Sequence, residues 1–249
     1  MVLPVWDPAL FMDAFCERRS PSLWDEPLNL ATNLALVVAA GLLVRRAAQL
    51  RSEGAQVPPS VQALIALIAA MALSSAAYHM AATRWAGVSD AMAVRVFALY
   101  FSVCFLRWLV GWSWSRVLLV LPLFAALGLL VPQSFVPTRG LLTFVATPLL
   151  PGLLGLVVFS TALALRNDAA WRPMALAAAA FGVALVCHRA DRALCDAVPT
   201  GTHFLWHVFS AVTVYLITRA VLERAVQRPQ PVLQPAPRPA TLAVLRAAE

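Results

Sequence analysis

The stretch that decides the fold is THFLWHVFSAVTVYLITRAV, residues 202–221. It is a continuous apolar run of the roughly 20 residues that an α-helix needs to cross the hydrocarbon core of a bilayer. Two histidines, His203 and His207, nevertheless stand near its start. Ionisable side chains inside a bilayer are costly and usually mark a functional interior. The stretch therefore predicts a transmembrane helix that carries a polar site at one end.

Similar runs recur along the whole chain, which predicts an all-α membrane protein. The sequence of 249 residues is 61% hydrophobic and only 12% charged, whereas a soluble domain carries about a quarter charged residues. The alternating pattern of a membrane barrel is absent. Seven transmembrane helices are expected, at Glu26–Val44, Val61–Thr83, Ser89–Leu106, Val117–Val131, Gly140–Leu165, Pro173–Cys187 and Thr202–Val221.

These spans divide the chain into an N-terminal segment (residues 1–25), a seven-helix domain (residues 26–222) and a Pro-rich tail (residues 223–249) that is expected to be disordered. Every basic residue is arginine, with six on the N-terminal side of the bilayer and twelve on the C-terminal side. The positive-inside rule then places the N-terminus outside and the C-terminus in the cytoplasm. Because the arginines lie between apolar runs rather than in one patch, the net charge of +7 indicates no nucleic-acid partner.

The predicted topology brings four ionisable residues to one depth. His79 lies near the outer end of the second span, Asp90 near the outer start of the third, and His203 and His207 in the first turns of the seventh. His203 and His207 are spaced i, i+4, so both project from one helix face. Together with His79 they supply three nitrogens, which with one water make an open, catalytic type of zinc site.

Two further side chains suit hydrolysis at such a site. Zinc lowers the pKa of its water towards neutrality, and Asp90 is placed to hold and deprotonate that water. Ser75 is one helical turn before His79, where its hydroxyl can donate to a developing oxyanion. The alternative is that lone histidines and serines serve as hydrogen-bonding groups between helices. His188, expected at an outer loop or helix end, is a further candidate ligand.

Haem ligation is a rival use of the histidines. Two axial ligands must approach opposite faces of the macrocycle, but His203 and His207 share one side of a helix. Each would need a partner from another helix, and only His79 and His188 remain. Zinc is therefore favoured over haem.

The combined motifs resemble the alkaline ceramidases, which belong to a seven-helix membrane hydrolase superfamily that includes the adiponectin-receptor-like proteins. The segments that carry the resemblance are FCERRSPSLWDEPLNLATNL, SAAYHM, Asp90, RADRALCD and HFLWH, which span Phe15 to His207. The resemblance implies zinc ligands at His79, His203 and His207, with Ser75 and Asp90 around the attacking water and the scissile carbonyl. It implies hydrolysis of the amide of a sphingoid lipid to a long-chain base and a fatty acid.

The resemblance also implies a calcium site in the N-terminal segment, with Phe15, Glu17 and Glu26 as ligands. Two positions depart from the family, since Ala14 and Arg19 replace oxygen ligands, and an arginine in the first shell opposes a hard cation. Asp13 or Asp25 can compensate, and the alternative is that these acids simply pair with Arg18 and Arg19. Calcium is therefore expected to bind weakly or not at all.

A disulfide between Cys16 and Cys195 is a further implication of the resemblance, with Cys187 as the competing partner. Both members of the pair fall on the outer side, where a disulfide persists. The arginine-only, alanine-rich composition is typical of a high-GC bacterium, which points to an inner-membrane protein with its site on the periplasmic side.

The expected partner is a lipid that enters sideways from the bilayer, ceramide or another N-acyl lipid. Two other function classes stay open, a receptor-like protein with a different lipid ligand or substrate and a non-catalytic metal or haem membrane protein. Retention of Ser75 and Asp90 favours the enzyme, because binding zinc requires neither. The sequence indicates no particular oligomeric state.

Overall fold

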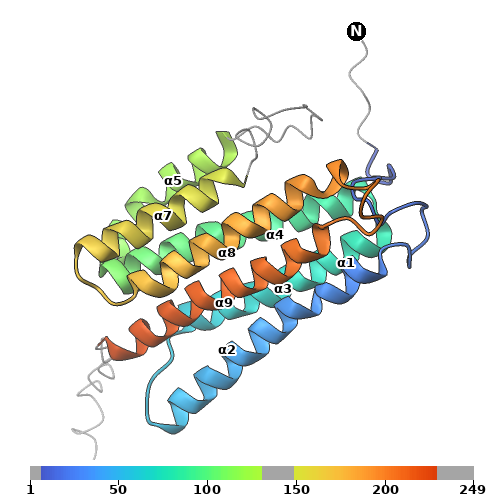
Figure 1. Ribbon diagram of the computed structural model, residues 1–249. Helices are drawn as coiled ribbons and strands as arrows, with labels where there is room; N and C mark the ends of the chain where they lie inside the picture. Colours follow the sequence, from blue (N-terminus) through green and yellow to red (C-terminus); the bar gives the residue numbers. More distant parts are fainter. Residues whose placement is uncertain (1–6, 131–148, 229–249) are drawn as a thin grey trace, which may run out of the picture.

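The computed structural model describes residues 7–130 and 149–228, and every regular element in these ranges is a helix. The helices are α1 (Pro27–Thr32), α2 (Leu34–Ser52), α3 (Pro59–Ala81), α4 (Arg84–Cys104), the π-helix η1 (Phe105–Val110), α5 (Trp114–Leu130), α7 (Leu150–Leu165), α8 (Trp171–Ala190), the 3₁₀-helix η2 (Asp191–Ala193) and α9 (His203–Gln227). Figure 1 shows the long helices aligned in a bundle, with α2 and the α5–α7 pair at opposite edges of the view. The predicted all-α class is confirmed for these residues.

Five helical stretches are long and apolar enough to cross a membrane, namely Pro27–Ser52, Pro59–Ala81, Arg84–Val110, Trp171–Ala193 and His203–Gln227. Leucines also project outward from the bundle, and Leu73, Leu119 and Leu165 are 74%, 80% and 81% exposed. Apolar side chains on the outside of the bundle suit a lipid environment, because lipid tails are as apolar as leucine and no hydrophobic force drives these side chains inward. The chain is therefore a multi-pass membrane protein.

The fourth and fifth predicted spans correspond to α5 and α7, which are apolar but shorter. Both predicted ranges continue into residues 131–148, which lie outside the described part of the chain, as do residues 229–249 of the predicted tail. Residues 223–227, which were predicted to belong to the disordered tail, form the end of α9. The count of seven spans and the sidedness of the termini therefore stay predictions.

Several helices are longer than the apolar runs that predict them. α4 begins at Arg84 rather than Ser89 and continues through η1 to Val110, where Gly111 adopts a φ of 92° and ends the helix. α8 covers Trp171–Ala190 rather than Pro173–Cys187, because a proline is tolerated in the first helical turn. Hydropathy marks only the apolar part of a helix, whereas the hydrogen-bonded backbone continues into its polar flanks. The first predicted span is divided at Asn33 into α1 and α2.

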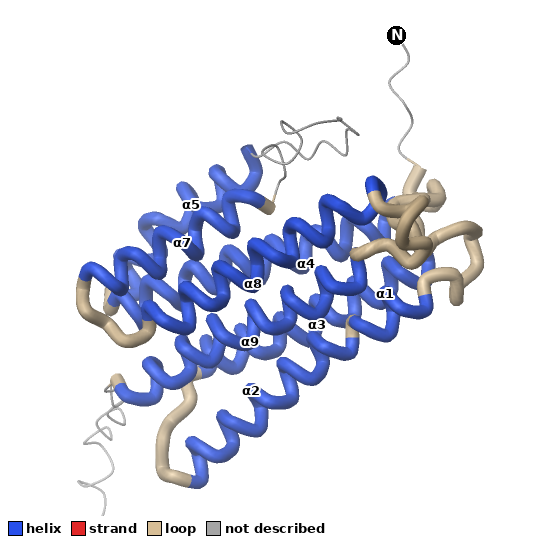
Figure 2. The backbone as a smooth tube through the Cα atoms, in the orientation of Figure 1, coloured by secondary structure: helices blue, strands red, loops and turns tan. Residues whose placement is uncertain are grey.

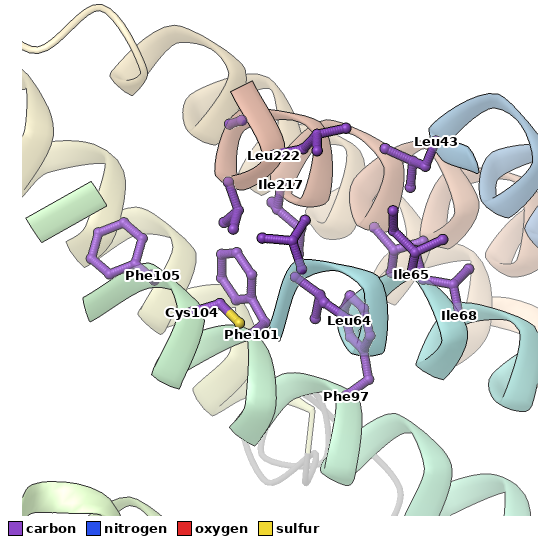
Figure 3. Close-up of a cluster of buried hydrophobic side chains, with 14 of the residues drawn as sticks. Leu43, Leu64, Ile65, Ile68, Phe97, Phe101, Cys104, Phe105, Ile217 and Leu222 are labelled. Carbon is purple, nitrogen blue, oxygen red and sulfur yellow. The ribbon is translucent and has the colours of Figure 1, made fainter. Parts of the chain in front are cut away.

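The middle of the bundle is an apolar core centred on α9, which packs against α8, α2 and α3. Figure 3 shows side chains of α3, α4 and α9 meeting there, among them Leu64, Phe101 and Ile217. Leu43, Leu64 and Leu222 are fully buried. This packing fixes the relative positions of α3 and α9, the two helices that carry the predicted ligands.

The N-terminal segment closes one end of the bundle, where Figure 2 shows most of the loop structure. Its backbone is tied to the α3–α4 connection, since the Met12 N–H donates to the Ala82 carbonyl and the Arg84 N–H donates to the Leu10 carbonyl. Ala82 itself ends α3 in the left-handed conformation, with a φ of 45°. The segment therefore covers the end of α3 that holds His79.

Candidate metal centre

The three predicted histidine ligands come together at the covered end of the bundle. His79 lies in the last turn of α3, and His203 and His207 lie in the first two turns of α9. The side chains are 1%, 3% and 2% exposed, and one ligand nitrogen from each lies within 4.8 Å of the other two. The structure thus brings His79 together with two histidines that lie more than 120 positions later in the sequence.

Hydrogen bonds on the far side of two imidazoles set which nitrogen faces the cluster. His79 Nδ1 is 2.6 Å from Glu26 Oε2, so it carries the proton and donates to the carboxylate. His207 Nδ1 is 2.9 Å from the Thr32 hydroxyl, which is itself within donating distance of the Leu28 carbonyl at 2.9 Å. The hydroxyl therefore accepts from His207 Nδ1, and both Nε2 atoms keep a lone pair.

The two Nε2 atoms of His79 and His207 face one another at 3.0 Å. The hydrogen bonds to Glu26 and Thr32 assign the protons of both imidazoles to Nδ1, so both Nε2 atoms are acceptors. Two acceptors at this distance repel each other unless a proton or a cation lies between them. The third histidine adds a further open nitrogen, because buried His203 Nδ1 has no hydrogen-bond partner among the described residues. Three buried imidazoles whose ligand nitrogens lie close together fit a zinc ion, which favours this donor set.

The start of α9 is anchored by Asp191, whose carboxylate is 1% exposed. Its Oδ1 accepts from the backbone N–H groups of Thr202 and His203, at 2.6 and 2.8 Å, and its Oδ2 accepts from the Cys16 N–H at 2.9 Å. Gly201 has a φ of 64°, and a Cβ there would collide with this carboxylate. Asp191 therefore fixes both the first turn of α9 and its distance from the N-terminal segment.

A disulfide joins Cys16 to Cys195, with the Cα atoms 5.2 Å apart. Cys187 and Cys104 are free, so the alternative pairing with Cys187 does not occur. The bond links the N-terminal segment to the connection between η2 and α9. The aromatic ring of neighbouring Phe15 stacks on the His203 imidazole, with centroids 3.5 Å apart.

Ser75 and Asp90 both lie at the histidine end of the bundle. Ser75 is 6% exposed and one turn before His79 on α3. Asp90 is half-buried in the second turn of α4, which follows α3 after a two-residue connection. Its Oδ1 is 3.5 Å from the hydroxyl of Ser74, a residue that the sequence analysis did not single out.

His188 lies in the last turn of α8 and does not belong to the ligand group. Its ring centroid is 5.0 Å from that of His203, and its Nδ1 has no partner within the described ranges. His188 thus forms part of the surroundings of the cluster. Thr32 was missed, because only tertiary contact gives its side chain a role at the site. Arg18 was expected only as a partner of the acids near it, and it does pair with Glu26, at 2.6 Å.

The residues proposed for calcium have other partners. Both oxygens of Glu17 accept from the backbone N–H groups of Leu28 and Asn29, at 2.7 and 2.8 Å, which caps α1. Glu26 divides its carboxylate between Arg18 Nε and His79 Nδ1, both at 2.6 Å. The Phe15 carbonyl accepts from the Arg18 N–H at 3.2 Å. These contacts place Glu26 behind a histidine of the cluster.

The family model described as Ceramidase matches residues 15–231, which includes all the described helices. No curated protein matches the chain.

Proposed function

The chain belongs to the ceramidase family, and from this premise we propose that it is a zinc-dependent amide hydrolase. Its proposed substrate is ceramide or a related N-acyl lipid, cleaved to a long-chain base and a fatty acid. The observation that carries the proposal is the facing pair of imidazole nitrogens, His79 Nε2 and His207 Nε2, with His203 beside them.

His79, His203 and His207 are the proposed zinc ligands. Bound zinc would supply Lewis-acid activation of a water molecule and of the substrate carbonyl. Glu26 holds the proton of the His79 imidazole on Nδ1, and Thr32 does the same for His207. The Nε2 atoms of both histidines are therefore available to bind zinc. Such outer partners orient the ligands and make them more basic.

Asp90 is the proposed general base and acid. It accepts the proton of the attacking water and passes that proton to the leaving amine, which an amide requires because an amine anion is a poor leaving group. Ser75 is proposed to donate a hydrogen bond to the carbonyl oxygen as negative charge develops on it. Its support is its burial one turn from His79.

The substrate is proposed to enter from the lipid. The support is that the cluster lies at one end of membrane-sized helices, where the polar part of an amphiphile would reach it while the chains remained in the bilayer. We also propose that this end faces the periplasm of a bacterial inner membrane. The disulfide at the same end supports the assignment, because disulfides persist in oxidising compartments.

The test is hydrolysis of a panel of ceramides, other N-acyl lipids and ester lipids in detergent micelles by zinc-loaded protein. The expected result is amide cleavage that Asp90→Asn nearly abolishes without loss of zinc. Asp13→Asn is a matched control, because Asp13 lies at the same end but is 50% exposed and pairs with Arg192. If no amide is cleaved, or if Asp90→Asn is as fast as wild type, the mechanism is wrong and a receptor-like role is favoured.

A further inference from the structure

Among the described residues, Arg18 is the arginine that is enclosed at the histidine end of the bundle. The side chain of Arg18 is 0% exposed, although it belongs to the N-terminal segment and precedes the first helix. An arginine in such a place is stable only when its donors are paired, because a buried charge is costly. The structure pairs all three of its nitrogens.

The guanidinium contacts are directed to four oxygens. Nε donates to Glu26 Oε1 at 2.6 Å, and one terminal nitrogen donates to the carbonyls of Ser20 and Ser22 at 3.2 and 2.7 Å. The other terminal nitrogen donates to the His79 carbonyl at 2.5 Å. This carbonyl lies in the last turn of α3, where helical carbonyls have no partner within the helix. Arg18 therefore joins the N-terminal loop, the start of α1 and the end of α3.

The same contacts hold His79 at two points. Arg18 binds its backbone carbonyl directly, and Glu26 connects Arg18 to the imidazole through Oε2 and His79 Nδ1 at 2.6 Å. Asn29 Nδ2 also donates to Oε2, at 2.9 Å, which fixes the plane of the carboxylate. The backbone and ring of one proposed zinc ligand thus depend on one guanidinium.

Carboxylate and carbonyl oxygens are the ligands that a hard divalent cation prefers. Here four of them surround a positive charge that the chain itself provides. Two further acids of the segment already have partners. Asp25 accepts hydrogen bonds from the N–H groups of Arg19 and Ser20, and Asp13 pairs with Arg192. Those backbone hydrogen bonds also lower the pKa of Asp25 below its usual value.

We propose that Arg18 is an internal cation and a positioning residue for the metal centre. Its guanidinium fixes Glu26, and through Glu26 the imidazole of His79, so that zinc binding requires no divalent cation in the N-terminal segment. The proposal rests on the proposed zinc site. From the sequence, Arg19 was expected to oppose calcium binding in this segment. In the structure, the side chain that occupies the cluster of oxygens is that of Arg18.

The first test measures zinc affinity by competition with a chelating dye, in wild type, Arg18→Ala, Arg18→Lys and Glu26→Gln. Loss of a partner behind a metal ligand typically weakens metal binding about 10- to 100-fold, which is the change expected for Arg18→Ala and Glu26→Gln. Arg18→Lys keeps the charge but loses the planar fork of donors, so an intermediate loss is expected. Arg192→Ala is the matched control, because it removes an exposed ion pair of the same segment.

Calcium gives the second readout. Wild-type zinc affinity is expected to be the same with added calcium and in buffer from which calcium has been removed beforehand. The proposal is overturned if Arg18→Ala binds zinc as tightly as wild type, or if calcium raises the wild-type zinc affinity tenfold.

A third readout requires no metal. Thermal unfolding of the metal-free single variants and of the Arg18→Ala/Glu26→Gln double variant should be non-additive, because the two residues share one hydrogen bond. Additive shifts would contradict the link between Arg18 and Glu26. A wild-type protein that binds no zinc but shows this coupling would refute the proposed zinc site, and with it the role of Arg18 in zinc binding, whereas the link between Arg18 and Glu26 would stand. Arg18→Lys replaces Arg18→Ala in the cycle if Arg18→Ala does not fold.

Discussion

The middle of the bundle and its histidine end bury different kinds of side chain. In the middle the buried polar groups are hydroxyls such as Thr213 and Thr218, within a core of leucine, isoleucine and phenylalanine. At the histidine end the described residues bury full charges and imidazoles, namely Arg18, Glu26, Asp191, His79, His203 and His207. Apolar packing therefore holds the middle, whereas the end also relies on directional hydrogen bonds and on the Cys16–Cys195 disulfide.

Because of this difference, we expect the middle of the bundle to determine mainly the stability of the protein and the histidine end to determine mainly its chemistry. Apolar packing tolerates small shifts, but a hydrogen-bonded network of buried charges is stable in few geometries. The two regions should thus respond differently to substitution: changes in the middle should alter unfolding and leave zinc binding unchanged, whereas changes to the hydrogen bonds behind the histidines should weaken zinc binding.

The largest effect is expected in the middle, from Leu222→Ala. Leu222 is 0% exposed, and removing a buried leucine side chain typically costs about 2–5 kcal/mol of the free energy of unfolding. Zinc content should not change. Chemical denaturation in micelles measures the loss, with Leu165→Ala as control because Leu165 is 81% exposed. A loss of zinc in folded Leu222→Ala would show that the two regions are not separate.

Ser75→Ala is expected to lower the hydrolysis rate about 100- to 1000-fold, the usual loss for one oxyanion donor. Zinc content and the unfolding midpoint should stay close to wild type. The control is Ser160→Ala, since Ser160 is a buried serine on α7 whose hydroxyl donates to the Trp171 carbonyl. Equal rates for the two variants would remove Ser75 from the mechanism.

Thr32→Val is the smallest expected change. It removes the acceptor for His207 Nδ1 while keeping the shape of the side chain, and zinc affinity should fall about 10- to 100-fold. Dye competition measures this fall. A variant that loses stability but keeps its zinc affinity would place Thr32 with the packing of the middle region instead.

Much of the histidine cluster could be predicted from the sequence. The i, i+4 spacing of His203 and His207 and the apolar run behind them fix a helix face, and counting spans brings His79 to the same end. These are local patterns combined with the length that a bilayer imposes. The disulfide was implied by the resemblance and is present between Cys16 and Cys195.

The hydrogen bonds behind the ligands could not be predicted. The N-terminal segment has no periodic pattern, so no local feature of the sequence indicates that the side chain of Arg18 is buried while that of its neighbour Arg19 is exposed. Glu26 was assigned to calcium by resemblance, whereas its carboxylate contacts His79 and Arg18. Such contacts depend on how α1, α3 and the N-terminal loop meet, which is a tertiary property.

The most direct test of the account is the metal content of the purified protein, measured by elemental analysis of wild type, His207→Ala and His188→Ala. His188 is the matched control, because it is a histidine at the same end that lies outside the ligand group. The account predicts one zinc per chain in wild type and in His188→Ala, and none in folded His207→Ala. Zinc that stays at the wild-type level in His207→Ala would contradict it.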